Sequence, residues 1–163
     1  MGVVLVYRDA KIEDLNQIVH CICSDLDSRY LKKEEDTIEY DKEAIEDFIS
    51  DSIKTKFRYF CVYEQNGEIL GGQLSLIEEN PFRKDLFLSD KIWFTSPKLS
   101  NFKRLMVAYR VLKGIPEYMN EHCVKLVKGD LHSTDGKTFP TAARKLLEKL
   151  GYKLMFQQYM KAI

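Results

Sequence analysis

Apolar residues recur at helical spacing in several parts of the chain. The first predicted helix covers residues 10–26, and its apolar positions are Ile12, Leu15, Ile18, Val19, Ile22 and Leu26. A second helix is marked by Ala44, Ile45, Phe48, Ile49 and Ile53. A third is marked by Phe102, Leu105, Met106, Tyr109 and Leu112. Asp9 suits the N-cap of the first helix. Gly114 and Pro116 should end or kink the third, because proline lacks the backbone donor of the helix.

Runs of β-branched and aromatic residues predict the strands. The clearest is a hairpin over 57–77, in which Asn66-Gly67 is the strongest short turn signal. Gly71-Gly72 in its second arm predicts a bulge or a close approach of two backbones. Further strands are expected at 3–9, 90–97, 123–131 and 152–163, and Pro97 stops the second of these.

The stretch ARKLLEKLGYK, residues 143–153, predicts a fourth helix and its end. Leu146 and Leu150 lie four residues apart on one face and are expected to be buried. Gly151 should stop the helix. Helices thus interrupt a largely consecutive set of strands, and no repeat or linker is present. We therefore expect a single domain over residues 1–163, with a mixed α/β or α+β sheet covered by helices.

The overall charge and the lengths of the apolar runs disfavour nucleic acid and membranes as partners. The chain has 25 basic and 25 acidic residues, so its formal net charge is zero and nucleic acid is not favoured as a partner. The longest apolar run, near Val3–Val6, is far too short to span a membrane. Arg8-Asp9 closes that run, and no signal peptide is recognised. A soluble, cytoplasmic protein is expected, and its oligomeric state stays open.

The cysteines predict neither a metal site nor a redox pair. Cys21 and Cys23 are two residues apart, which is not the Cys-x-x-Cys spacing. His20 beside them would point in another direction on a helix. Together with Cys61 and Cys123 they are expected to be reduced and mostly buried thiols. No metal ligands are assigned.

Fragments from four parts of the chain share the patterns of one known family. YRDAKIEDLNQIV carries R-x-A-x-x-x-D, and FCVYEQNGEILGGQLSLI has the form of a central hairpin. KIWFTSPKLSNFKRLMVAYRVLKG has the form of a strand, a cofactor loop and a helix, and AARKLLEKLGYK is similar to a closing A-x-x-x-Y-x-K-L-G-F. In this order the fragments resemble the GNAT superfamily of acyltransferases. The resemblance implies a mixed, mostly antiparallel sheet of about six or seven strands flanked by about four helices. It also implies acetyl-CoA as co-substrate and a small-molecule or protein amine as acceptor.

By this resemblance the co-substrate binds where a strand ends and the next helix begins. The corresponding residues are Phe94, Thr95, Ser96, Ser100, Asn101, Lys103 and Arg104. A helix start binds pyrophosphate because its unpaired N–H groups and its dipole meet negative charge. The glycines of the family are missing from SPKLSNFKRL, so cationic side chains would have to replace a close backbone approach. The alternative interpretation is a solvated basic helix start with an ordinary cap.

The residues that would carry catalysis are less clearly marked. Family members often use a tyrosine as proton donor to the leaving thiolate, and Leu147 occupies that position here. An amine must lose a proton before it attacks, so a nearby base is useful. The candidate bases are Glu78, Glu79, Asp90, Asp130 and His132. Of these we favour Glu78 and His132 as catalytic residues.

Two functions stay open at the level of sequence. The first is an acyl-CoA-dependent N-acyltransferase with an atypical cofactor loop, which ranks first because most chains of this fold are enzymes. The alternative is a catalytically inactive GNAT-fold binding or structural protein, which the missing glycines and Leu147 favour. The composition, rich in Lys, Glu, Ile and Tyr, is compatible with an AT-rich genome such as that of a bacterial virus.

Overall fold

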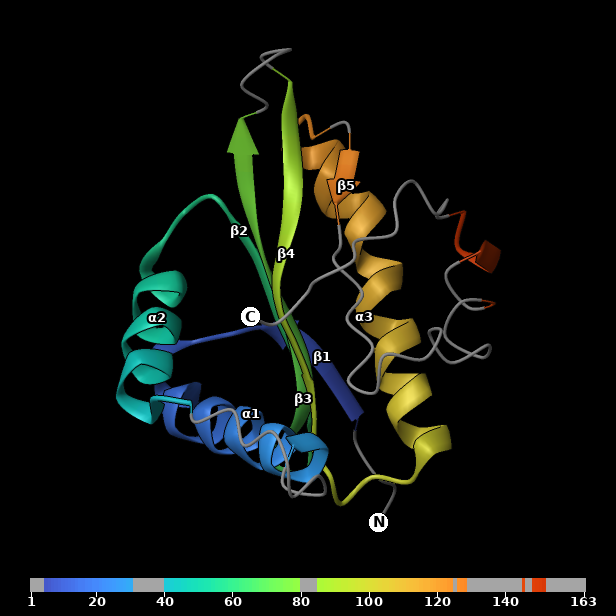
Figure 1. Ribbon diagram of the computed structural model, residues 1–163. Helices are drawn as coiled ribbons and strands as arrows, with labels where there is room; N and C mark the ends of the chain where they lie inside the picture. The colour runs from blue at the N-terminus through green and yellow to red at the C-terminus, as the bar shows by residue number, and fades with distance from the viewer. Residues whose placement is uncertain are drawn as a thin grey trace, which may run out of the picture.

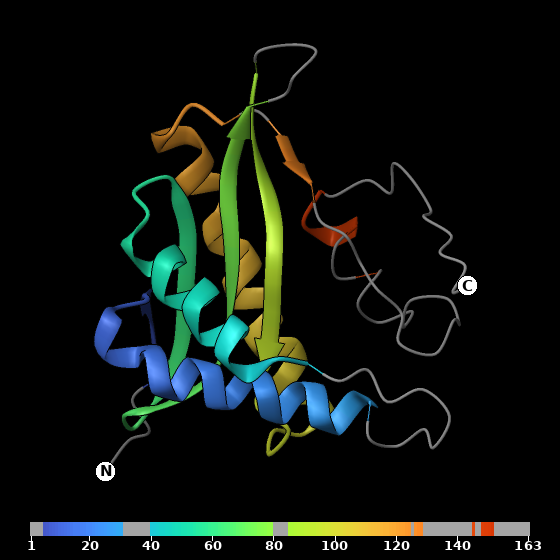
Figure 2. The same cartoon turned by 60° about the vertical axis from the view of Figure 1, so that its left-hand side comes forward.

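The computed structural model describes residues 5–30, 40–79, 85–124, 126–128, 145 and 148–151. The helices are η1 (Ile12–Asp14), α1 (Leu15–Tyr30), α2 (Lys42–Lys54) and α3 (Asn101–Glu121). The strands are β1 (Leu5–Asp9), β2 (Arg58–Gln65), β3 (Glu68–Glu79), β4 (Leu86–Thr95) and β5 (Leu126–Lys128). The sheet lies between two helical layers, with α1 and α2 on one face and α3 on the other (Figures 1 and 2).

The described strands form one sheet in the order β1-β2-β3-β4-β5. Neighbours from β1 to β4 are antiparallel, and β5 pairs with β4 in parallel. One core joins the sheet to α1 and α2 and includes Ile18, Ile49, Phe60, Leu74 and Phe94. The other joins it to α3 and includes Tyr59, Cys61, Leu88, Val111 and Ile115. The mixed, mostly antiparallel α+β architecture is confirmed, whereas the predicted numbers of strands and helices extend beyond the described residues.

The hairpin predicted over 57–77 is formed by β2 and β3. Asn66 and Gly67 both have positive φ angles, 54° and 83°, which the type I′ turn requires. The close approach predicted at Gly71-Gly72 is also confirmed. A Cβ on Gly72 would lie 2.5 Å from the Cys61 carbonyl oxygen, so a side chain there would clash with β2.

The R-x-A-x-x-x-D pattern forms an ion-pair clamp where β1 leads into the helices. The Arg8 guanidinium donates to both oxygens of Asp14, at 2.6 and 2.9 Å, and to Glu64 of β2, at 2.7 Å. Asp14 also accepts the Lys11 N–H at 2.8 Å. The N-cap prediction for Asp9 is therefore wrong. Asp9 ends β1, and the Asp14 carboxylate satisfies the helix start instead.

Helix α3 continues through Pro116 to Glu121, so the end predicted near Gly114 is wrong. A hydroxyl from the sheet adds a hydrogen bond in this part of the helix, because Tyr59 donates to the Val111 carbonyl at 2.8 Å. Glycine is required for this packing, since a Cβ on Gly114 would lie 2.7 Å from the Tyr59 hydroxyl. Tertiary contacts thus hold a helix that its local sequence would end.

Other element bounds also differ from the predicted ones. Helix α1 runs past residue 26 to Tyr30, and β4 begins at Leu86 rather than at 90. The strand predicted from 123 starts later, because Cys123 lies in a turn with a φ of 55°.

The closing helix is described only at Lys145 and residues 148–151. Gly151 has a φ of 85°, and its N–H donates to the Glu148 carbonyl at 3.1 Å. This geometry confirms the predicted helix end. Leu150 is partly buried and packs against the core beneath α3. Leu146, Leu147 and the strand predicted at 152–163 lie outside the described residues.

The four cysteines are free thiols, as expected. Cys21, Cys23 and Cys61 are buried, and Cys123 is exposed. Within the described ranges, no helix has the length and apolar character needed to cross a membrane. The same ranges contain no cluster of three or more His, Cys, Asp or Glu side chains that could hold a metal ion.

Candidate functional site

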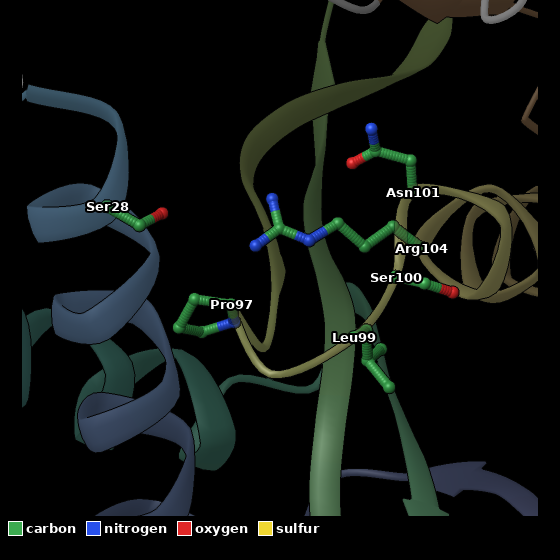
Figure 3. Close-up of a pocket in the computed structure, with 6 residues that line it drawn as sticks. All are labelled: Ser28, Pro97, Leu99, Ser100, Asn101 and Arg104. Atoms are coloured by element: carbon green, nitrogen blue, oxygen red, sulfur yellow. The ribbon is translucent and has the colours of Figure 1, made fainter.

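The candidate site is a cavity of about 550 Å³ between α1 and the start of α3. Its lining residues are Ser28, Pro97, Leu99, Ser100, Asn101 and Arg104. Ser28 belongs to α1, and Pro97 and Leu99 lie in the loop between β4 and α3. Figure 3 shows the Arg104 side chain extending from α3 toward the helix that carries Ser28. The cavity is thus placed where elements from both faces of the sheet meet.

The start of α3 gives the cavity a positive end. Ser100 caps the helix, and its hydroxyl accepts the Lys103 N–H at 3.4 Å. A helix N-terminus carries a partial positive charge and has N–H groups without helical partners. Ser100 and Asn101 line the cavity, so this end of the helix borders it. The arrangement favours a negatively charged ligand.

Arg104 adds a full positive charge and an unused donor. Its Nη1 lies 4.0 Å from Oδ1 of Asp25, which is too far for a hydrogen bond between these atoms. Its Nε is buried and has no hydrogen-bond partner in the described part of the chain. A buried donor without a partner costs about 1–3 kcal/mol. Solvent does not reach this Nε in the observed conformation, so an acceptor oxygen in the cavity could bond to it only after the Arg104 side chain turns.

Asp25 connects α1 to the end of β4. Its Oδ2 accepts the backbone N–H of Thr95 at 3.3 Å, and its side chain is 4% exposed. Burial and then the charge of Asp25 are the main reasons why the pKa of the Cys21 thiol is raised to about 12. Cys21 therefore stays protonated at neutral pH and cannot serve as a nucleophile.

Strand β4 extends toward the cavity past the three residues that pair with the described part of β5. β5 pairs with Phe87–Ser89 only. From Asp90 to Thr95, no strand in the described ranges lies on that side of β4. This edge, Asp90–Thr95, is called the free edge because no described strand pairs with it, and at about 3.3 Å per residue it is on the order of 20 Å long. A free strand edge offers backbone donors and acceptors to an extended ligand.

A buried polar network lies where this free edge begins. Oδ1 of Asp90 accepts hydrogen bonds from Gln73 Nε2 at 2.7 Å and from Ser75 Oγ at 2.6 Å. Gln73 and Ser75 are fully buried. The two donors fix the orientation of the Asp90 carboxylate at the centre of the sheet. Asp90 is therefore a carboxylate of fixed orientation at the start of the free edge of β4.

Some of the predicted cofactor residues line the cavity, and the others do not. The cavity is lined by three of them, Ser100, Asn101 and Arg104. Thr95 is linked to Arg104 through Asp25. Phe94 and Ser96 are buried at 1% and 6% exposure, Phe94 within the core that contacts α1 and α2. Lys103 is exposed on α3 and does not line the cavity.

The two predicted bases are not brought to the cavity by the described structure. Glu78 forms an ion pair with Lys91, and its side chain is 40% exposed. It lies opposite Phe87, in the part of β4 that still pairs with β5. His132 lies outside the described residues.

Sequence reasoning does not single out Asp25 or Ser28, and it includes Pro97 and Leu99 only as part of the stretch SPKLSNFKRL. Asp25 carried a signal that could have found it. It follows Cys21 by four residues, so both lie on the buried face of α1, where a carboxylate is unusual. Ser28 lines the cavity only because of how α1 and α3 approach each other, and no local sequence pattern predicts that approach.

Solved structures match this chain over almost its whole length. No protein-family model matches the sequence, and no curated protein matches it significantly. Aminoglycoside N-acetyltransferase AAC(6')-Iy in complex with CoA matches with a TM-score of 0.69 and 11% identity, covering 100% of this chain and 97% of that one. Glucosamine-6-phosphate N-acetyltransferase from Arabidopsis thaliana matches with a TM-score of 0.65 and 13% identity, covering 98% of each chain. A transcriptional regulator from Bacillus halodurans C-125 matches with a TM-score of 0.70 and 15% identity, covering 98% of this chain and 100% of that one.

The chain has the fold of the GNAT acetyltransferases. This finding confirms the family resemblance seen in the sequence at the level of the fold. At identities of 11% and 13% the likeness defines architecture alone, so the function has to be argued from the residues of the site.

Proposed function

We propose that this protein is a divergent GNAT N-acyltransferase that transfers an acyl group from acyl-CoA to an amine. The acyl group that we propose first is acetyl. The observation that carries the proposal is the buried Nε of Arg104, a donor with no partner among the described residues, at a cavity beside a helix start. An arginine fork together with a helix N-terminus suits a pyrophosphate. A structural neighbour in complex with CoA supports the same ligand.

The residues present fit the phosphate end of acyl-CoA in an unusual way. No glycine occurs from Ser96 to Arg104, so Cβ atoms limit how closely phosphates can approach the backbone over most of this stretch. Arg104 and the N–H groups at the start of α3 would hold them instead. The free edge of β4 would hold the extended arm through backbone hydrogen bonds. When bound, acyl-CoA supplies an activated acyl thioester.

We assign the general base to Asp90 rather than to Glu78. A base has to take the proton that the amine loses as it attacks. Asp90 is oriented by Gln73 and Ser75 where the free edge of β4 begins. Glu78 is held in an ion pair with Lys91. The position of Asp90 along β4 supports its contact with the reacting amine.

Thiol release from acetyl-CoA in the presence of amines tests the proposed reaction. The amine panel includes aminoglycosides and amino sugars, because structural neighbours are named for these substrates. Turnover with at least one amine is expected. Asp90→Asn should lower kcat about 10²-fold and leave the Kd for CoA unchanged. Glu78→Gln is the matched control on the neighbouring strand and should keep kcat within about twofold of the native value.

A GNAT-fold binding protein without catalysis is the second candidate. One observation favours it, because Asp25 already accepts the Thr95 N–H and faces Arg104, so the chain fills part of its own site. A transcriptional regulator among the solved neighbours has the same fold. CoA binding without turnover of any amine would support this candidate and contradict the enzyme.

A further inference from the structure

Asp25 places a buried negative charge beside the positive charge of the candidate site. The Asp25 side chain is 4% exposed, and that of Arg104 is 27% exposed. Asp25 is anchored to β4 through the Thr95 N–H at 3.3 Å. Arg104 comes from α3, so the pair joins helices from opposite faces of the sheet (Figure 1). Any anion that enters the cavity therefore meets an arginine that already has a carboxylate nearby.

The pair leaves part of the arginine unused. At 4.0 Å, the Nη1–Oδ1 contact is an ion pair without a hydrogen bond. The buried Nε has no partner in the described ranges. A phosphate accepts two parallel N–H bonds from a guanidinium. A phosphate oxygen would thus satisfy Arg104 better than Asp25 does.

We propose that Asp25 is a built-in competitor for the anionic end of the ligand and thereby sets the affinity and charge selectivity of the site. This inference rests on the proposed function, in which the anionic end is the pyrophosphate of acyl-CoA. Without ligand, Asp25 attracts the Arg104 guanidinium. With ligand, the guanidinium turns to the phosphate oxygens, and Asp25 keeps its bond to Thr95.

The competition has a direct consequence for selectivity. Asp25 repels every anion in the cavity, and the repulsion is strong because the effective dielectric constant is lower than in water. A ligand with one negative charge gains little over the carboxylate already present. A pyrophosphate carries more charge and more acceptor oxygens, so it can displace Asp25 from Arg104. The site therefore selects polyphosphate groups over simple carboxylates.

Calorimetric titration of four proteins tests the competition. They are the native chain, Asp25→Asn, Arg104→Gln and the double variant, each titrated with CoA and with inorganic pyrophosphate. Asp25→Asn should tighten binding of both probes about tenfold, because it removes the competing charge and keeps the side-chain shape. The gain should shrink below about threefold when Arg104 is glutamine, because the freed arginine is then missing.

A control and a second readout separate this role from a general effect. Asp47→Asn, on the exposed face of α2, makes the same change in net charge and should leave both affinities unchanged. Asp25→Asn should also make binding of CoA more sensitive to salt, because the site then holds an uncompensated cation. Thermal unfolding confirms that each variant is folded before titration.

Each outcome supports or overturns a distinct claim. Weaker or unchanged binding in Asp25→Asn would overturn the competitor role, and CoA binding by the native chain would leave the proposed function standing. Tighter pyrophosphate binding in Asp25→Asn without CoA binding in any variant would support the competitor role and contradict the acyl-CoA ligand. Failure of both probes to bind any of the four proteins would overturn both.

Discussion

Two arginine–aspartate pairs in this molecule are buried to a similar degree but differ in the distance between their charged groups. The side chains of Arg8 and Asp14 are 26% and 10% exposed, and those of Arg104 and Asp25 are 27% and 4% exposed. Arg8 donates to both oxygens of Asp14 at 2.6 and 2.9 Å. Arg104 stays 4.0 Å from Asp25. The two pairs therefore do not differ much in burial. They differ in hydrogen bonding, because only Arg8 donates hydrogen bonds to its aspartate.

We interpret the difference as that between a structural pair and a pair that binds the proposed ligand. Hydrogen bonds to Asp14 and Glu64 raise the pKa of Arg8 despite desolvation, and the bond from Arg8 lowers the pKa of Asp14. That pair holds β1, β2 and η1 together and does not line the candidate cavity. The Arg104–Asp25 pair borders a cavity and leaves a donor unused. For this reason we place the proposed ligand site at the Arg104–Asp25 pair and not at the Arg8–Asp14 pair.

The largest expected effect comes from breaking the complete pair. Arg8→Gln leaves Asp14 and Glu64 without their cation, and partly buried charges that lose a partner are costly. The free energy of unfolding should fall by about 2–3 kcal/mol. Urea denaturation measures it. Arg110→Gln, an exposed arginine on α3, is the control and should stay within about 0.5 kcal/mol of the native value. Equal losses in both variants would contradict the structural role of Arg8.

The second effect is a pH dependence at the same pair. Because the folded pKa of Asp14 is lowered, its carboxylate contributes stability above the unfolded value of about 3.9, and the contribution disappears as pH falls through the lower folded pKa. Asp14→Asn should therefore lose about 1–2 kcal/mol at pH 7. The difference from the native chain should shrink below about pH 4. A difference that grows on acidification would show that the sign is wrong.

The incomplete pair should contribute less to stability. Arg104→Gln is expected to lower the free energy of unfolding by about 1 kcal/mol or less, because its ion pair lacks a hydrogen bond between the paired atoms and glutamine can still donate one. Denaturation of Arg8→Gln and Arg104→Gln under identical conditions gives the comparison directly. A loss at Arg104 as large as that at Arg8 would make it a structural residue.

The smallest effect is expected at Lys103, which the sequence suggested as a cofactor residue. It is exposed and outside the cavity, so Lys103→Ala should change stability by no more than about 0.5 kcal/mol. Its effect on the Kd for CoA should stay below about threefold, as expected for a screened surface charge. A tenfold loss of affinity would move the binding surface from the cavity to the outer face of α3.

Local chemistry explains which elements could be predicted. The Asn66-Gly67 turn and the Gly151 helix end depend on backbone angles that few other residues adopt, so the sequence alone identifies them. The passage of α3 through Pro116 could not be predicted, because α3 packs against sheet residues such as Tyr59 that are distant in the sequence. The prediction that Asp9 caps the first helix is wrong because the helix start too depends on contacts between residues distant in the sequence. Arg8 and Glu64 hold Asp14 in place, and only the folded chain brings Glu64 near.

The candidate site likewise contains residues that local sequence could predict and residues that only the folded chain brings together. SPKLSNFKRL contains most of the cavity lining, because a strand end and the following helix start are adjacent in the chain. Asp25 and Ser28 come from α1, and only the packing of α1 against β4 brings them there. The choice of Asp90 over Glu78 as the proposed base could not be made from the sequence, because it depends on which residues of β3 and β4 lie opposite each other.

Amide chemical shifts of the isotope-labelled full chain, recorded during titration with acetyl-CoA, test the central claim most directly. That claim is that the incomplete pair, and not the complete one, marks the ligand site. The account predicts saturable shifts at Asp25, Thr95 and the start of α3, from Ser100 to Arg104, with no shifts at Arg8 or Asp14. Shifts at Arg8 and Asp14, or none anywhere at millimolar acetyl-CoA, would contradict it.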